Sequence, residues 1–268
     1  MQEHQTMNSP HPCDEPEEPE QTIDALCKTH GTFRAKVIQG PFGPPITQRC
    51  QLCQQQARDE SEARRASTAE LERRNHVAEL NREAGIPARF QSRSIESYLA
   101  NQDGQKRVVN IARRFVDTWT EQREKGTSLI FTGGPGTGKT HLACAIGKAL
   151  LESQLAAVRF GTVTGLLRSI KDTYRPGSER SEQQAFDSIL QYDLLIVDEI
   201  GVQLGTDHEK LLLFEVLNER YQGSLPTILI SNLSAADLEI FLGQRVMDRY
   251  RECGAVVAFD WPSHRGVK

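Results

Sequence analysis

Short apolar runs alternate with amphipathic stretches over most of the chain after Asp103. The apolar runs predict strands at residues 128–132, 157–162, 194–197, 227–230 and 255–259. Helical periodicity predicts helices at residues 105–123, 141–151, 164–173, 208–221 and 235–251, with one more leading to Tyr192. Continuous apolar strands separated by helices are typical of a sheet covered on both faces. The pattern therefore predicts an α/β fold with a parallel sheet between helices.

The N-terminal third lacks this alternation. Residues 1–22 are polar, with four prolines and five acidic residues between Asp14 and Glu20, and are predicted to form a disordered acidic tail. Residues 23–57 contain a Cys/His cluster around a loop rich in Gly and Pro, and residues 58–85 predict a mostly solvated helical linker. The remaining residues, 86–268, form the predicted main domain, in which only Asp260–Lys268 follow the last strand. A helical lid is therefore not expected.

Composition narrows the function classes. The 32 basic and 36 acidic residues nearly balance, so overall charge does not indicate nucleic-acid binding. No apolar run approaches the length of a membrane span, and the polar N-terminus does not resemble a signal peptide, so a cytoplasmic protein without membrane contact is expected. In such a chain, paired cysteines indicate metal or redox chemistry sooner than disulfides.

A complete phosphate-binding loop follows the strand at 128–132. Its sequence, G-x-x-x-x-G-K-T, comprises Gly133, Gly134, Pro135, Gly136, Thr137, Gly138, Lys139 and Thr140. The glycines let backbone N–H groups converge on a triphosphate, Lys139 brings positive charge to the β- and γ-phosphates, and the Thr140 hydroxyl can ligate Mg²⁺. A helix begins directly after the loop, which adds a favourable helix N-terminus. The chain is therefore predicted to bind a nucleoside triphosphate.

Two acids, Asp198 and Glu199, end the apolar strand at 194–197. A buried parallel strand brings its C-terminal end beside the phosphate loop, where Asp198 can hold Mg²⁺ and Glu199 can polarise an attacking water. Ser231 and Asn232 end the next strand, and the Asn232 amide is placed to orient that water or contact the γ-phosphate, although a plain strand-end turn would also favour Asn. The paired acids predict an ATPase.

Arg245 and Arg249 are four residues apart and share one face of a predicted helix. Either arginine can reach the γ-phosphate of a neighbouring subunit as an arginine finger. A solvated basic helix is the alternative explanation, and the residues alone favour it.

Two ligand pairs precede the main domain. Cys27-x-x-His30 and Cys50-x-x-Cys53 are separated by nineteen residues, and four Cys/His ligands in two tight pairs satisfy tetrahedral Zn²⁺. A closed set of this kind is typical of a structural ion. Unrelated free thiols and an exposed His are the alternative.

Several stretches resemble the DnaC-type loaders of the bacterial replicative helicase, which belong to the AAA+ superfamily of P-loop NTPases. The resemblance covers roughly residues 86–268, and its motifs are GKTHLA at 138–143, IKDTYR at 170–175, LLIVDEIGVQ at 194–203, RVMDR at 245–249 and FDWPSHR at 259–265. It implies an AAA+ fold, ATP as the nucleotide, a hexameric helicase as partner, single-stranded DNA along an inner face, and self-association into a ring or spiral. It also implies that the N-terminal zinc module grips the helicase.

The resemblance assigns further roles by position. Asn232 becomes the sensor, Arg249 the arginine finger, and His141 and Arg265 additional ATP-binding residues, with Arg265 replacing a second sensor. Residues in positions that contact single-stranded DNA are Lys171, Tyr174, Arg175, Thr206 and His208. His208 stands where the family has an aromatic Tyr, and is therefore a weaker stacking group.

Two alternatives to a helicase loader stay open. An IstB-like transposition helper ATPase shares much of the core but has a different N-terminus, so the zinc pairs and the DTYR stretch argue against it. A DNA-binding scaffold that binds ATP with little turnover would have no use for Glu199 and Arg249.

Overall fold

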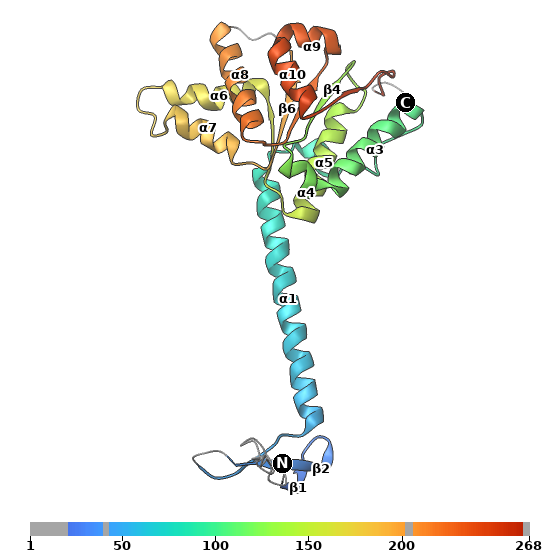
Figure 1. The fold of residues 1–268 in the computed structure, drawn as a ribbon, viewed down its shortest axis with the longest axis vertical. Helices are drawn as coiled ribbons and strands as arrows, with labels where there is room; N and C mark the ends of the chain where they lie inside the picture. The colour runs from blue at the N-terminus through green and yellow to red at the C-terminus, as the bar shows by residue number, and fades with distance from the viewer. Residues whose placement is uncertain (1–20, 40–42, 202–205, 265–268) are drawn as a thin grey trace, which may run out of the picture. The chain divides into compact units, whose positions relative to one another are not determined.

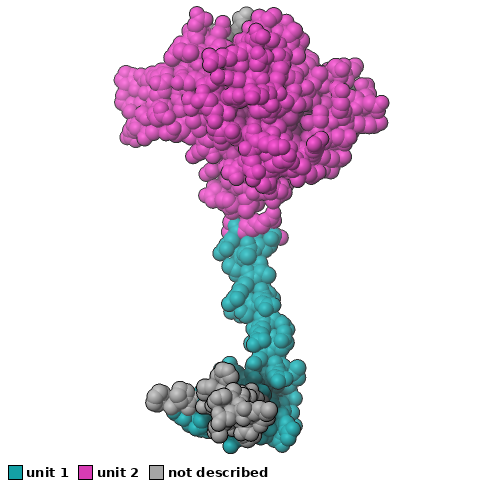
Figure 2. Space-filling view, viewed as in Figure 1, with its two compact units in different colours: residues 1–72 teal, residues 73–268 magenta. Residues whose placement is uncertain are grey.

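The computed structural model describes residues 21–39, 43–201 and 206–264 and divides the chain into two compact units, residues 1–72 and 73–268 (Figure 2). The predicted acidic tail falls almost wholly outside the described residues, although Thr22 already belongs to a strand. The division between the units falls within the predicted linker at 58–85.

Unit 1 contains a small antiparallel sheet that was not predicted from the sequence. Its strands lie in the order β1-β2-β3 and are β1 (Thr22–Cys27), β2 (Gly31–Ile38) and β3 (Ile46–Thr47) (Figure 1). Phe33 and Ala35 pair with Ala25 and Ile23 on one face of the sheet. The alternating apolar positions of β2 were a readable strand signal. The hairpin turn after Cys27 carries the first predicted ligand pair.

Helix α1 (Gln51–Glu83) follows this sheet and is 33 residues long (Figure 1). It has no buried residue, in agreement with the predicted solvated helix. Near its end, within unit 2, Val77 and Leu80 pack against the core of that unit. Although α1 is long, it is largely polar. No helix in the described part of the chain is both long and apolar enough to cross a membrane.

Unit 2 is built on a five-stranded sheet in the order β5-β6-β7-β4-β8, and every pairing in it is parallel. The predicted α/β fold with a parallel sheet between helices is confirmed. The strands, all within about three residues of their predicted bounds, are β4 (Ser128–Thr132), β5 (Val158–Thr162), β6 (Leu194–Ile200), β7 (Thr227–Ser231) and β8 (Gly254–Ala258).

Each face of this sheet carries its own core, because successive strand residues point to opposite faces. Ile196 and Phe131 belong to one core, whereas Val197 and Ile130 belong to the other. The first face is covered by α2 (Ala88–Gln91), α3 (Asp103–Asp117), α4 (Trp119–Glu124) and α5 (Lys139–Gln154). The second is covered by α6 (Val163–Lys171), α7 (Glu182–Leu190), α8 (Asp207–Gln222), α9 (Ala235–Leu242) and α10 (Gln244–Glu252) (Figure 1).

Three predicted helices needed correction. The single helix expected at 235–251 is two helices, because Gly243 has φ 79° and ends α9. The helix expected at 105–123 is divided at Thr118 into α3 and α4. The helix expected at 164–173 ends at Lys171 and continues as the 3₁₀ turn η1 (Asp172–Tyr174).

Candidate functional site

The predicted phosphate loop connects β4 to α5 and folds around its own lysine. The Lys139 ammonium donates to the carbonyl oxygens of Gly133 at 2.6 Å and Gly134 at 2.7 Å. Gly136 has φ 81° and Gly138 has φ 94°, a left-handed backbone that side chains disfavour. Two backbone carbonyl groups of the loop thus hold the Lys139 ammonium.

The two acids of β6 meet this loop. Asp198 accepts the Thr140 hydroxyl at 2.8 Å through Oδ2 and the Glu199 backbone N–H at 2.7 Å through Oδ1. The pairing of β6 with β7 is interrupted between Val197 and Ile200, and Glu199 there has φ 65°. A non-glycine residue held in this region is disfavoured, and such residues concentrate at functional sites. The strand thus contains a register shift near its end, and Glu199 is exposed there.

These residues line one cavity of about 350 Å³. Its lining joins the loop to both acids and to the end of β7, and consists of Arg89, Phe90, Pro135, Gly136, Gly138, Lys139, Thr140, His141, Asp198, Glu199 and Asn232. The volume falls in the range of small-ligand sites. The structure therefore brings together the predicted phosphate, Mg²⁺, water-polarising and sensor residues.

A second cavity of about 360 Å³ shares Arg89, Phe90, Gly136, Gly138 and His141 with the first. It adds Arg93, Ser97, Tyr98, Leu99 and His264. The sequence pattern did not predict this side of the site, because most of the added residues come from irregular segments before α3 and after β8. The apolar residues between positions 86 and 100, among them Ile86, Ile95 and Tyr98, were the available signal in the sequence.

His141 lies between the two cavities. Its Nε2 atom is 3.2 Å from Ser97 Oγ and 3.2 Å from the Ser94 carbonyl oxygen, and its ring centroid is 5.4 Å from that of Tyr98. Burial lowers the pKa of His141 below its usual value. The imidazole is therefore neutral near pH 7 and held by its neighbours at the cavity wall.

The end of β7 is fastened to the rest of the site. The Ser231 hydroxyl donates to the Ile200 carbonyl oxygen at 2.6 Å, and the Gly133 N–H donates to the Leu233 carbonyl oxygen at 3.3 Å. Asn232, between Ser231 and Leu233 in the sequence, lines the first cavity. Arg265, the predicted second sensor, lies outside the described residues.

Neither candidate finger is among the residues that line the two cavities next to the phosphate loop in the described part of the chain. Arg249 donates to Asn218 Oδ1 and lies over the Tyr221 ring, 5.2 Å from its centroid. Arg245 is exposed one turn earlier on α10. Both line a separate cavity of about 590 Å³ between α8 and α10. The geometry thus gives Arg249 no role at the site described above.

Two of the predicted DNA-contacting residues, Lys171 and Tyr174, contact the start of α8. Lys171 Nζ lies 2.8 Å from Glu209 Oε1, and the Tyr174 and His208 ring centroids are 5.9 Å apart. The Tyr174 hydroxyl donates to Glu182. Burial, and in second place the Glu182 carboxylate, raise the pKa of Tyr174 to about 12. Arg175 pairs with Asp172 at 2.9 Å, and the Thr206 hydroxyl accepts the Glu209 N–H at 3.2 Å as the cap of α8.

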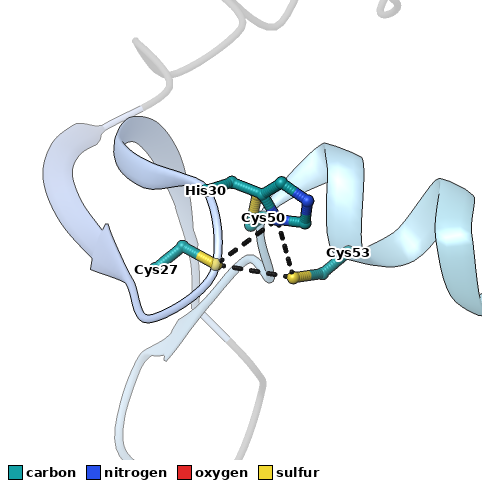
Figure 3. A group of neighbouring side chains, drawn as sticks. All are labelled: Cys27, His30, Cys50 and Cys53. Atoms are coloured by element: carbon teal, nitrogen blue, oxygen red, sulfur yellow. Dashed lines mark hydrogen bonds between the residues drawn. The ribbon is translucent and has the colours of Figure 1, made fainter.

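The four predicted zinc ligands converge in unit 1 (Figure 3). Cys27 and His30 come from the β1–β2 hairpin, Cys50 precedes α1, and Cys53 lies in its first turn. Their ligand atoms lie within 4.8 Å of one another; Cys27 Sγ is 3.4 Å and His30 Nδ1 is 3.2 Å from Cys53 Sγ. Zinc–sulfur bonds of about 2.3 Å in a tetrahedron put sulfur atoms roughly 3.8 Å apart. The donor set and its spacing fit a zinc ion.

The lowered pKa of one cysteine in this cluster also favours metal binding. Backbone N–H groups of Thr29 and His30, together with the His30 ring, lower the pKa of Cys27 to about 6. The neighbouring Cys27 and burial raise the pKa of Cys53 to about 11. The hairpin therefore stabilises the Cys27 thiolate, and metal ligation requires thiolates.

Comparisons with known proteins agree with this architecture. The family model of the IstB-like ATP binding proteins matches residues 62–250. The chain is 36% identical over 202 residues to the replicative helicase loader DnaC of Escherichia coli strain K12, covering 74% of this chain and 80% of that protein. It is 32% identical over 205 residues to DnaC of Buchnera aphidicola subsp. Baizongia pistaciae, covering 75% and 82%.

Solved structures extend the similarity to three dimensions. The crystal structure of the DnaC helicase loader matches with a TM-score of 0.58 and 26% identity, covering 64% of this chain and 99% of that chain. The crystal structure of DnaI matches with a TM-score of 0.55 and 24% identity, covering 68% and 95%, which is a likeness of fold.

Proposed function

Because the chain belongs to the family of IstB-like ATP-binding proteins and DnaC-type helicase loaders, we propose that it loads a hexameric replicative DNA helicase onto single-stranded DNA when replication begins. ATP binding and hydrolysis switch its grip on the helicase and the DNA. The observation that carries the proposal is the 36% identity with DnaC over 80% of that protein's length. The proposed partners, DNA and the helicase, are cytoplasmic, so the proposal assigns the protein to that compartment.

The proposed chemistry is hydrolysis of ATP with Mg²⁺. Lys139 binds the β- and γ-phosphates, while Thr140 and Asp198, which already share a hydrogen bond, hold Mg²⁺. The ion neutralises phosphate charge. Glu199 polarises the attacking water and Asn232 orients it, supported by their common position on the wall of one cavity.

Arg249 is proposed to act on the ATP of a neighbouring subunit, which requires self-association into a ring or spiral. Its contacts with Asn218 and Tyr221 on α8 support this role, because they keep the guanidinium at a defined place away from its own nucleotide cavity. An arginine finger supplied by a second chain would complete each site only on assembly.

The zinc cluster is proposed to hold one structural Zn²⁺ through Cys27, His30, Cys50 and Cys53, and the module around it is proposed to bind the helicase.

The single-stranded DNA is proposed to follow η1 and the start of α8, where Tyr174 and His208 offer rings and Lys171 and Arg175 offer charge.

The alternative is a transposition helper ATPase, favoured by the description of the matching family model. Both candidates hydrolyse ATP, so the partner distinguishes them. The test uses the full chain with the purified replicative helicase encoded by the same genome. An oligonucleotide annealed to circular single-stranded DNA, which has no free end, should be unwound only when the chain, ATP and the helicase are all present.

The same experiment separates the candidates. A stable complex with the helicase on size-exclusion chromatography, together with ATP-dependent unwinding, supports a loader. The transposition helper predicts neither, and instead stimulation of a transposase. A chain that binds DNA and ATP without turnover in any of these mixtures would be a scaffold.

A further inference from the structure

The carbonyl oxygen of Thr137, in the middle of the phosphate loop, accepts two hydrogen bonds from aromatic side chains. The Tyr98 hydroxyl donates to it at 2.8 Å and the Trp261 indole N–H at 2.9 Å. Both side chains are buried, with exposed fractions of 7% and 6%. The two donors come from opposite ends of unit 2, one before α3 and the other after β8. A buried carbonyl that accepts twice is fixed in direction.

The neighbouring peptide is held in the same way. The backbone N–H of His264 donates to the Gly136 carbonyl oxygen at 3.0 Å. The His264 ring is itself held, because the Gln105 side-chain nitrogen lies 2.9 Å from His264 Nε2. Residues that follow β8 therefore contact two successive carbonyl groups of the phosphate loop.

These contacts set the direction of the phosphate-binding N–H groups. A trans peptide is planar, with its C=O and its N–H pointing in opposite directions. The carbonyl of Thr137 shares its plane with the N–H of Gly138, and the carbonyl of Gly136 shares its plane with that of Thr137. Donors that hold both carbonyls on one side turn both N–H groups toward the other side. Backbone N–H groups of this loop cradle the phosphates.

The segment after β8 is closely fitted to the loop. The Phe259 N–H donates to the Thr132 carbonyl oxygen at 2.8 Å, and the Phe259 ring lies 5.1 Å from Phe131 and 5.0 Å from Trp261. A Cβ atom on Gly133 would lie 2.2 Å from the Phe259 carbonyl oxygen, and one on Gly138 would lie 2.7 Å from the Tyr98 ring. Glycine at positions 133 and 138 therefore leaves room for the Phe259 backbone and the Tyr98 ring, as well as for the nucleotide.

We infer that Tyr98 and Trp261 are positioning residues for ATP: they hold the Thr137–Gly138 peptide in its phosphate-binding orientation, and so link the C-terminal segment to nucleotide occupancy. The inference rests on the ATP-binding part of the proposed function and assigns the link to residues outside the loop itself. Since linkage is reciprocal, bound ATP also stabilises the seating of Trp261.

The test compares ATP affinity in full-length variants that remove one donor and keep a ring. Tyr98→Phe and Trp261→Phe should each weaken ATP binding by roughly twofold to tenfold, the effect of one neutral hydrogen bond. The double variant should lose more than the product of the two, because the Thr137 carbonyl is then buried without a partner. Binding is measured by anisotropy of a fluorescent ATP analogue.

Matched controls separate positioning from general stability. Tyr250→Phe removes a buried hydroxyl that donates to the Leu217 carbonyl oxygen at 3.2 Å in the other core, and Trp119→Phe removes a buried indole without a contact to the loop. Both should lower the melting temperature and leave ATP affinity unchanged. Trp119→Phe also leaves Trp261 as the sole tryptophan of the two in the chain, and its emission should change on ATP addition.

Wild-type ATP affinity in the folded double variant would overturn the inference. If the double variant does not fold, the two single variants decide, and losses no larger than those of Tyr250→Phe and Trp119→Phe overturn it. Lys139→Ala in the same assay distinguishes a failure of the proposed ATP site from a failure of the proposed role of Tyr98 and Trp261. Its loss of binding shows that the ATP site is correctly assigned even when the aromatic donors prove unimportant.

Discussion

The Thr140 hydroxyl donates to Asp198 Oδ2 across 2.8 Å, although the two residues are 58 positions apart in the chain. Thr140 stands in the first turn of α5 and Asp198 near the end of β6. The parallel sheet makes this contact, because β4 and β6 end at the same edge. The two proposed oxygen ligands for Mg²⁺ are therefore already adjacent, and substitutions here should change nucleotide chemistry with little effect on folding.

Nucleotide binding and turnover should be separable by two substitutions. Lys139→Ala should abolish measurable ATP binding, because it removes the only side-chain cation inside the loop among the described residues. Glu199→Gln should bind ATP but hydrolyse it roughly 10²- to 10⁴-fold more slowly, the usual contribution of a general base. Phosphate release and analogue binding measure the two effects. Lys148→Ala on the same helix is the control and should resemble wild type.

An unchanged hydrolysis rate in Glu199→Gln would show that another group activates the water. Asn232, on the same cavity wall, would then be examined next.

Local motifs made the centre of this site predictable. The loop from Gly133 to Thr140 and the acids Asp198 and Glu199 are contiguous in sequence, and each needs only a strand end to reach its place. Tyr98 and Trp261 could not be predicted as partners, because they are 163 positions apart in the chain and only the folded chain brings both to the Thr137 carbonyl.

The same distinction holds in unit 1. Residue spacing was sufficient to predict that Cys27, His30, Cys50 and Cys53 form one cluster, since both pairs are local. The sheet that aligns the pairs was missed because β1 and β3 are short, exposed and lack a continuous apolar run. Helix breaks were missed for a related reason. Gly243 adopts φ 79° within a stretch whose apolar periodicity continues on both sides.

The purified chain should contain one zinc ion per molecule, measured by elemental analysis without added metal. Cys50→Ser should lose the ion, whereas Cys253→Ser, which changes a thiol in unit 2, should retain it. Zinc should also be released as the pH falls, because protons compete for thiolate and imidazole ligands. A folded N-terminal module without metal, or a Cys50→Ser protein that holds zinc as tightly, would contradict the assignment.

Tyr174→Ala should weaken binding to a short single-stranded oligonucleotide without changing ATP affinity. Tyr174 is 47% exposed and lies beside His208, and stacking of one base on an aromatic ring contributes about 1–3 kcal/mol by alanine substitution. Fluorescence anisotropy with a labelled oligonucleotide measures the change. Tyr192→Ala, at a tyrosine outside this cluster, is the control, and equal affinities in wild type and Tyr174→Ala would count against this surface.

Glu209→Gln should have the opposite effect on DNA. Glu209 pairs with Lys171 at 2.8 Å and competes with DNA phosphates for the ammonium. Exposed ion pairs are weak and are screened by salt, so the gain in affinity should be only a few-fold at low salt and should vanish as salt rises. The gain should also be absent when Lys171 is replaced by Ala, whereas a gain that persists in that background would mean that Glu209 acts elsewhere.

Hydrolysis should require two subunits to meet, because Arg249 lines no nucleotide cavity of its own chain among the described residues. Arg249→Ala should bind ATP normally and hydrolyse it roughly 10³-fold more slowly, as arginine fingers contribute in well-studied cases. Mixing it with Lys139→Ala should restore part of the activity. An intact phosphate loop from the first protein then meets an intact finger from the second, a junction that neither variant forms alone. Activity is measured as phosphate release under conditions where wild type assembles.

A mixture as inactive as its components would exclude Arg249, and Arg245, exposed one turn away on α10, would be tested in the same way.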